Sequence, residues 1–206
     1  MDKIEIDERY VKAGKIAATV REHFKKKDLV GMTVNQVCDE VESMTRKLGA
    51  EPGFPCGVSI NSVTAHYSGE LFDDQIINDD AVIKLDLGAH IDGYVADTET
   101  TICYNPDYQE LTLATETALN NAIKAVKDKI SSSNIGKVIS DTAEKFGFIP
   151  ISNLSGHSCA GDYLYPPIFP QISWDQHPNE HARMELLRQH THVRDMKIFL
   201  IGYWGC

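Results

Sequence analysis

The sequence lacks the features that mark membrane or secreted proteins. Its charged N-terminal segment holds no apolar stretch of about 7–15 residues, so no signal peptide is expected. No apolar run approaches the roughly 18 residues that a transmembrane helix needs. The cysteines number five, an odd count without C-x-x-C spacing, which favours reduced thiols over a disulfide framework. Together these absences predict a cytoplasmic protein.

An excess of basic residues is also lacking. The 206 residues carry a formal net charge of -10 with a pI near 5.2, and the acidic residues are spread along the chain. Nucleic acids and anionic membranes both attract basic patches, so neither is expected as the main partner. The hydrophobic fraction of 42% and the charged fraction of 24% are those of a globular protein able to build a core.

Helical periodicity marks the first part of the chain. Residues 7–27 place apolar side chains at intervals typical of an amphipathic helix. Thr33 and Gln36 form a capping box at the start of a second helix, and Gly49 stands where a C-cap glycine belongs. The Gly/Pro-rich segment EPGFPCG then predicts a turn before a short strand at Val58–Asn61. The two apolar stripes consist of Val11, Ile16, Val20 and Phe24, and of Val34, Val37, Val41, Met44 and Leu48.

Similar elements follow in the second part. A long helix is predicted at about 108–130, then a Ser-rich loop at 131–134 and a shorter helix that ends at Gly147. Phe148–Leu154 is predicted to be a strand. The order of helix, helix, strand, hairpin, helix, helix and strand indicates an α+β protein built from two similar αα-ββ units, of which the second is incomplete.

The segment AVIKLDLGAHIDGYVADTETTICY predicts a β-hairpin. Two β-rich runs flank Asp92-Gly93, which is the strongest short-range signal for a two-residue hairpin turn. In that register Gly88 lies opposite Asp97, and Asp86 lies opposite Glu99. Asp86 and Asp97 then share one face as diagonal neighbours, with Cβ atoms within roughly 7–8 Å, and Gly88 leaves open space beside them.

Two interpretations of this carboxylate pair remain open. Carboxylates that converge in a half-buried sheet repel each other and lose solvation, so they need a proton or a cation, and a hard divalent metal suits oxygen ligands. Alternatively, the pair faces solvent, because the apolar residues of the same strand make the other face look like the buried one. Those residues are Leu85, Leu87, Ala89 and Ile91.

Two histidines also follow predicted strands. His157 comes directly after Gly156, and His66 lies in the segment INSVTAHYS. Histidine is a common nitrogen ligand of catalytic metals, although a lone histidine at a strand end more often has a structural role.

Three segments together resemble the signature segments of methionine aminopeptidases in order and spacing. They are SINSVTAHYS at 59–68, KLDLGAHIDGYVADT at 84–98 and NLSGH at 153–157. The A-H-Y and N-L-S-G-H segments are similar to those of the type II, archaeal-like branch. The resemblance implies a pita-bread fold, with a first αα-ββ half and an incomplete second half.

The resemblance also implies an activity and a set of site residues. The family removes the initiator methionine from nascent polypeptides by hydrolysis with two divalent metal ions, which are Co, Mn, Fe or Zn. Asp86 is similar to the ligand of one metal, Asp97 to the carboxylate that bridges both, and His157 to the single imidazole ligand. His66 is similar to a catalytic histidine that contacts the substrate. Phe54 resembles an aromatic wall of the methionine pocket.

The resemblance covers residues 1–157, an incomplete metallopeptidase domain, and residues 158–206 are interpreted as a divergent tail. The family completes its site further along with a second substrate-facing histidine and two glutamates. The region that corresponds to the second histidine is Asp162–Tyr165, and it contains no histidine. Glu180 and Glu185 lie in sequence that is unlike either glutamate motif of the family. Impaired activity is therefore expected for this chain.

The tail itself has two interpretations. An abrupt change after a well-matched segment is what a reading-frame shift in the gene would produce, and a natural divergent segment is the alternative. In the second case, His177 and His181 have the i, i+4 spacing of helical zinc ligands.

Two other functions are considered beside aminopeptidase activity. One is a non-catalytic pita-bread protein that binds partners, which the presence of Asp86, Asp97 and His157 disfavours. The other is a proline-specific dipeptidase of the same fold, which the A-H-Y segment disfavours.

Overall fold

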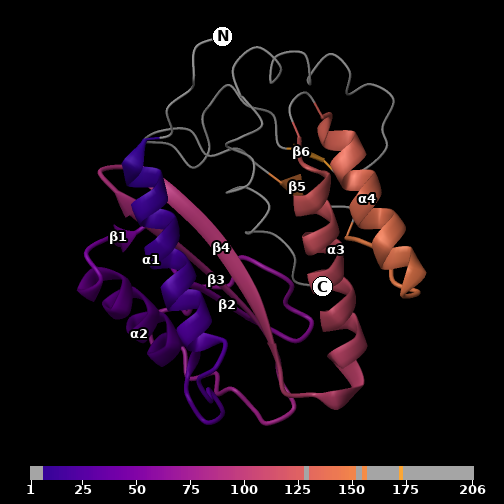
Figure 1. The fold of residues 1–206 in the computed structure, drawn as a ribbon. Coiled ribbons are helices and arrows are strands. Elements are labelled where there is room, and N and C mark those ends of the chain that lie inside the picture. The colour runs from indigo at the N-terminus through magenta and orange to yellow at the C-terminus, as the bar shows by residue number, and fades with distance from the viewer. Residues whose placement is uncertain (1–6, 128–129, 152–154, 157–171, 174–206) are drawn as a thin grey trace.

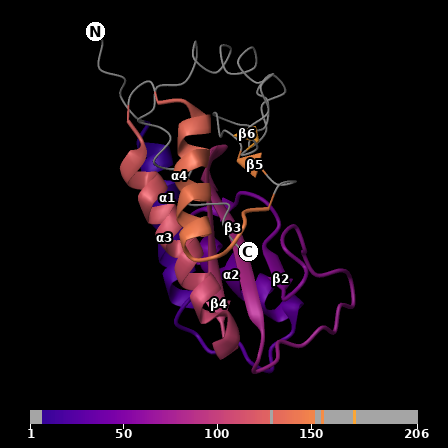
Figure 2. The same ribbon diagram turned by 90° about the vertical axis from the view of Figure 1, so that its right-hand side faces the viewer.

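The computed structural model describes residues 7–127, 130–151, 155–156 and 172–173. It has the α+β composition that the sequence predicts, with a pair of helices before the main sheet and a second pair after it (Figures 1 and 2). The elements are α1 (Glu8–Phe24), α2 (Val34–Lys47), β1 (Glu51–Pro52), β2 (Gly57–Ile60), β3 (Val82–Ile91), β4 (Tyr94–Cys103), the 3-10 helix η1 (Pro106–Tyr108), α3 (Gln109–Ala125), α4 (Ser132–Lys145), β5 (Ser155–Gly156) and β6 (Ile172–Ser173).

Local capping residues set the bounds of the first two helices. The Asp7 side chain accepts a hydrogen bond from the backbone N–H of Arg9, so it satisfies an N–H group that the first turn of α1 leaves unpaired. The predicted capping box between Thr33 and Gln36 is present at the start of α2. Gly49 has a φ of 89°, the left-handed conformation that ends helices. Both predicted helices are thus confirmed, with small differences at their ends.

The hairpin of β3 and β4 has the predicted register. Ile91 pairs with Tyr94, and the antiparallel ladder continues without a break to Val82 and Cys103. Both turn residues, Asp92 and Gly93, have positive φ angles of 51° and 82°. This is the geometry of a type I′ turn, whose twist matches that of the strands it joins.

The other edge of β3 pairs with two short strands, and one of them was missed. Gly57–Ile60 forms β2, close to the predicted strand, and pairs with Ile83–Asp86. The EPGFPCG segment is not only a turn, because Glu51 and Pro52 form β1 against His90 and Ala89. The prediction failed because Pro52 cannot donate a ladder hydrogen bond, although an edge strand tolerates this loss.

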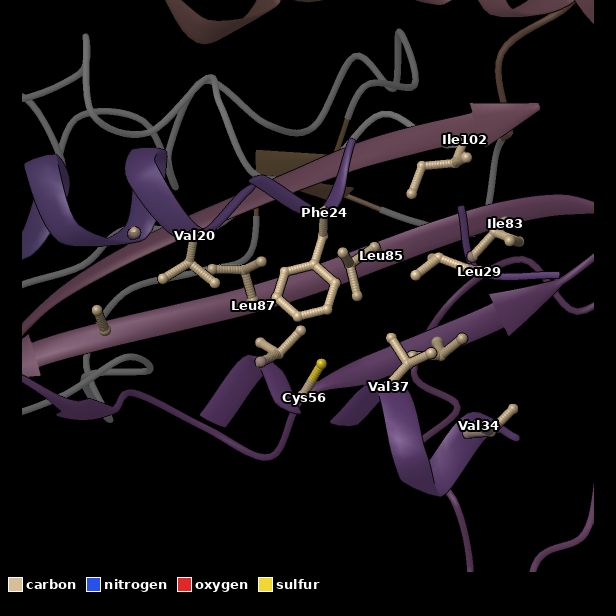
Figure 3. Close-up of a cluster of buried hydrophobic side chains, with 14 of the residues drawn as sticks. Val20, Phe24, Leu29, Val34, Val37, Cys56, Ile83, Leu85, Leu87 and Ile102 are labelled. Atoms are coloured by element: carbon tan, nitrogen blue, oxygen red, sulfur yellow. The ribbon is translucent and has the colours of Figure 1, made fainter. Parts of the chain in front are cut away.

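The main core lies between the helices α1 and α2 and one face of the sheet. In Figure 3, Val20 and Phe24 point from α1 toward Leu85 and Leu87 of β3. Val11, predicted for the same stripe, is 42% exposed instead. The buried apolar side chains of α1 and α2 are Ala13, Ile16, Ala17, Val20, Phe24, Val34, Val37 and Val41. This packing fixes which face of the hairpin points away from the helices.

The second pair of helices has its own small core. Ala118 and Ala122 of α3 pack against Ile135 and Ile139 of α4, and the two helices lie side by side in Figures 1 and 2. The predicted long helix ends at Ala125 rather than near 130.

Two predictions for the segment after α3 were wrong. The predicted loop at 131–134 mostly belongs to α4, because the Ser131 side chain caps the N–H of Asn134 and starts the helix at Ser132. Phe148–Ile151 is not a strand, because the Phe148 N–H bonds back to Ala143 O at 3.0 Å and Pro150 has no N–H to donate. The rest of the predicted strand, at 152–154, lies outside the described residues.

A helix must be both long and predominantly apolar to cross a bilayer. Within the described ranges, no helix combines the length and the apolar character that crossing a membrane requires.

Candidate active site

Three rungs of the hairpin place polar side chains on the face that points away from α1 and α2. In the ladder, Lys84 lies opposite Thr101, Asp86 opposite Glu99, and Gly88 opposite Asp97. Because side chains alternate across a strand, residues 84, 86 and 88 share one face with 97, 99 and 101. The neighbouring positions on β3, which include Leu85 and Leu87, enter the main core instead. The predicted arrangement of Asp86 and Asp97 on one face is therefore present.

This face is not a hydrated surface. Asp97 is only 8% exposed and Lys84 only 2%. Asp86 is partly buried, and its Oδ1 atom is shielded from solvent with no hydrogen-bond partner among the described residues. The interpretation of a solvent-facing carboxylate pair is wrong, because the sheet is buried on both faces.

Burial and mutual repulsion change the acidity of this face. Desolvation, followed by the charges of Asp97 and Glu99, raises the pKa of Asp86 to about 9. Desolvation and Asp97 raise the pKa of Glu99 to about 8, although Lys84 opposes the shift. Without a cation, Asp86 and Glu99 therefore retain protons at neutral pH.

Glu99 was not predicted as a site residue. It belongs to the polar face because it lies directly opposite Asp86. The predicted register already contained this signal, since it paired the same two residues. A like-charge pair directly across two strands destabilises a sheet, which was a reason to look for a charge that compensates it.

Phe54 lies against the same face. The chain leaves the edge of β3 between β1 and β2, and the Gly53 N–H donates to Gly88 O at 3.0 Å. A Cβ added at Gly88 would lie 2.7 Å from Phe54 Cδ1 and closer still to Cε1. The space that the sequence predicted beside Gly88 is thus filled by the Phe54 ring, one rung from Asp86 and opposite Asp97.

His66 lies in the loop after β2, in a conformation uncommon for a residue with a side chain. Its φ is 62°, and the side chain is exposed. The next residue is anchored, because the Val58 N–H donates to Tyr67 O at 2.7 Å. Gly57, adjacent to Val58, pairs with Asp86. The A-H-Y segment is therefore held beside the rung that carries Asp86, and such local strain is found often at functional sites.

The third predicted metal ligand, His157, lies outside the described residues, as do Glu180, Glu185 and the pair His177 and His181. Within the described ranges, no three His, Cys, Asp or Glu side chains are grouped so that they could hold a metal ion. The described part of the chain therefore supplies two of the three predicted ligands.

The donor set that is described fits a divalent cation. Both predicted ligands offer carboxylate oxygens, which hard divalent ions prefer. The buried Oδ1 of Asp86 has no hydrogen-bond partner among the described residues, and desolvation, followed by the charges of Asp97 and Glu99, raises the pKa of Asp86. A bound cation would satisfy the oxygen and replace the proton.

Comparison with known proteins identifies relatives of the chain. A model of metallopeptidase family M24 matches residues 8–185. The methionine aminopeptidase of Methanocaldococcus jannaschii is 45% identical over 155 residues, which are 75% of this chain and 53% of that protein. The chain thus spans about half the length of this relative. The resemblance to archaeal methionine aminopeptidases is confirmed.

Solved structures confirm the predicted pita-bread fold. The methionine aminopeptidase of Thermotoga maritima has a TM-score of 0.74 at 25% identity, over 87% of this chain and 76% of that chain. A prolidase from Pyrococcus furiosus has a TM-score of 0.71 at 22% identity, over 83% of this chain and 52% of that chain, which shows a shared fold alone.

Proposed function

The chain belongs to metallopeptidase family M24, and we propose that it provides the N-terminal half of a methionine aminopeptidase site. The proposed substrate is the N-terminal methionine of nascent polypeptides in the cytoplasm. The proposed reaction is hydrolysis of the first peptide bond, with divalent metal ions as cofactors.

One observation carries the proposal. The hairpin places Asp86 and Asp97 on a single buried face, and the Phe54 ring packs on Gly88 directly across from Asp97. A pair of metal-ligating carboxylates suits the polar reacting group of a substrate, and an apolar aromatic wall beside it suits a thioether side chain. This combination favours methionine at the site over a charged first residue.

The described residues have distinct proposed roles. Asp86 and Asp97, together with His157, would hold the metal ions, which supply Lewis acidity and an activated water when bound. Phe54 would contact the methionine side chain, and its ring packs against Gly88. His66 would contact the substrate near the scissile bond, from a segment tied to β2 by the Val58–Tyr67 hydrogen bond.

Proline-specific dipeptidase activity is the alternative within the same fold. Its support is the likeness to prolidase structures, which concerns the fold alone. The curated relatives at 36–45% identity are methionine aminopeptidases instead. Two substrates separate the two functions. A Met-Ala-Ser peptide and an X-Pro dipeptide would both be cleaved at the same carboxylates, but they require different substrate pockets.

The activity test compares two polypeptides. We expect the 206-residue chain to show no measurable turnover of Met-Ala-Ser with added Co²⁺ or Mn²⁺, because two-metal hydrolysis needs all ligands to act as a unit. A chimera that joins residues 1–157 to the C-terminal half of the Methanocaldococcus jannaschii relative should release methionine. The same chimera with His66→Ala should lose most of that activity while still binding metal.

Each other outcome has a defined meaning. A folded chimera that cleaves only the X-Pro dipeptide would replace the proposal by the prolidase alternative. A chimera inactive on both peptides would contradict catalysis by this half. Turnover by the 206-residue chain that Asp97→Ala abolishes would mean that residues after His157 supply ligands.

A further inference from the structure

Two cysteines of the described chain come together between α2 and the segment that leads into β2. Cys38 lies on α2, and its Sγ donates to the backbone O of Cys56 at 3.3 Å. One helical turn further along, Glu42 Oε1 accepts the Cys56 N–H at 3.4 Å. The next residue, Gly57, is fixed in the sheet opposite Asp86. The fold therefore holds the Cys56 backbone against the Cys38 thiol.

The two thiols differ in their access to solvent. Cys56 is only 2% exposed and belongs to the main core, in the same cluster as Val37 of α2 (Figure 3). Cys38, the residue after Val37, packs against that core from its edge and is half-buried. A small neutral oxidant such as hydrogen peroxide therefore reaches the Cys38 sulfur more easily than the Cys56 sulfur.

The surroundings of Cys38 also favour its thiolate. Interaction with the Cys56 side chain and, to a smaller extent, with the Gly69 backbone lowers the pKa of the Cys38 thiol, although burial opposes the shift. The same interaction between the side chains, together with burial, raises the pKa of Cys56. Because the thiolate is the form that attacks peroxides, Cys38 is the thiol that reacts first.

We propose that Cys38 and Cys56 form a peroxide-sensitive dithiol, in which oxidation of Cys38 is followed by a disulfide bond to Cys56. The inference goes beyond the proposed function, because it involves neither the metal ions nor the peptide substrate. It agrees with the reduced thiols that the sequence predicts, since cytosolic disulfides that sense oxidants are transient.

The chemistry needs one oxidant and balances in two steps. In the first step the Cys38 thiolate attacks one oxygen of hydrogen peroxide, the O–O bond breaks, and the hydroxide that leaves takes up a proton as water. Cys38 is then a sulfenic acid. In the second step the Cys56 sulfur attacks the Cys38 sulfur, the S–O bond breaks, and the hydroxyl group leaves as water with the Cys56 proton. The two thiols lose two electrons in total, and one peroxide is reduced to two water molecules.

The test treats the full 206-residue chain with hydrogen peroxide in chelator, so that no metal ion takes part. After free thiols are blocked with iodoacetamide, peptide mapping by mass spectrometry should find the Cys38–Cys56 disulfide, and dithiothreitol should remove it. Dimedone, which reacts with sulfenic acids, should label Cys38 when it is present during oxidation.

Three variants assign the steps. Cys56→Ala should lose the disulfide and keep the dimedone label on Cys38, because the first step is still possible. Cys38→Ser should lose both the disulfide and the label at this pair. Cys103→Ala removes a thiol of β4 outside the pair and should leave the disulfide unchanged. If Cys56→Ala does not fold, the peptide map of the wild-type chain still tests the bond.

Oxidation in urea shows whether the fold brings the two thiols together. In the native chain the Cys38–Cys56 bond should make up most of the disulfide, whereas in urea its share should fall as other cysteine pairs form. If native Cys38 pairs with another cysteine, or with none, the inference is wrong. It is also wrong if the share is unchanged in urea, or if dimedone labels Cys56 in place of Cys38. None of these outcomes bears on the proposed metal site, which Asp97→Ala tests separately.

Discussion

Replacing Asp86 by asparagine should change how the stability of the metal-free protein depends on pH. The pKa of Asp86 is raised from 3.8 to about 9 in the folded protein. Between these values the folded state holds a proton that the unfolded state has released, so the free energy of unfolding falls as pH rises. Below the unfolded value both states are protonated and the penalty vanishes.

The magnitude follows from the size of the shift. Each pH unit within the window costs about 1.4 kcal/mol per group, so about three units, from pH 5 to pH 8, would cost about 4 kcal/mol for a fully buried acid. Asp86 is only partly buried, and solvent screening reduces the effect. We therefore expect about 2 kcal/mol, a large share of the total stability of an ordinary domain.

Urea unfolding followed by circular dichroism, in chelator at several pH values, measures this effect. The difference between Asp86→Asn and wild type should grow by about 2 kcal/mol from pH 5 to pH 8 in favour of the variant. Asp79→Asn, which removes an exposed carboxylate, should run parallel to wild type. Parallel curves for Asp86→Asn and wild type would refute the claim that Asp86 is protonated in the folded, metal-free protein.

Two further predictions concern packing and thiol chemistry. Gly88→Ala should lower the free energy of unfolding by about 1–3 kcal/mol, because its Cβ would overlap the Phe54 ring. Gly14→Ala, which adds a Cβ in open space on α1, should raise the free energy of unfolding by about 0.5–1 kcal/mol in the same urea titration. Iodoacetamide should label Cys38 before Cys56 in peptide mapping by mass spectrometry, because the interaction between the two side chains lowers the pKa of Cys38 and raises that of the more buried Cys56. Faster labelling of Cys56, or equal stability of the two glycine variants, would contradict these expectations.

Local signals were sufficient for the hairpin and for the first two helices. Asp92-Gly93 fixed the turn, and with a two-residue turn every rung follows by counting, so the shared face of Asp86 and Asp97 could be derived from sequence. Thr33 and Gln36 fixed the start of α2 because a capping box involves only neighbouring residues. These features depend on contacts within a few residues or across one tight turn.

Burial and the neighbours from distant segments were decided by tertiary structure. The strand pattern left open whether the carboxylate face was hydrated, but Asp97 and Lys84 are buried because both faces of this sheet are covered. Phe54 fills the space beside Gly88 only because β1 and β2 use the same edge of β3. The sequence by itself determined which residues share a face, since alternation and register are local. Only the tertiary structure decided that this face is desolvated, which raises the pKa of Asp86 and Glu99 and makes a cation the natural counterpart of their charge.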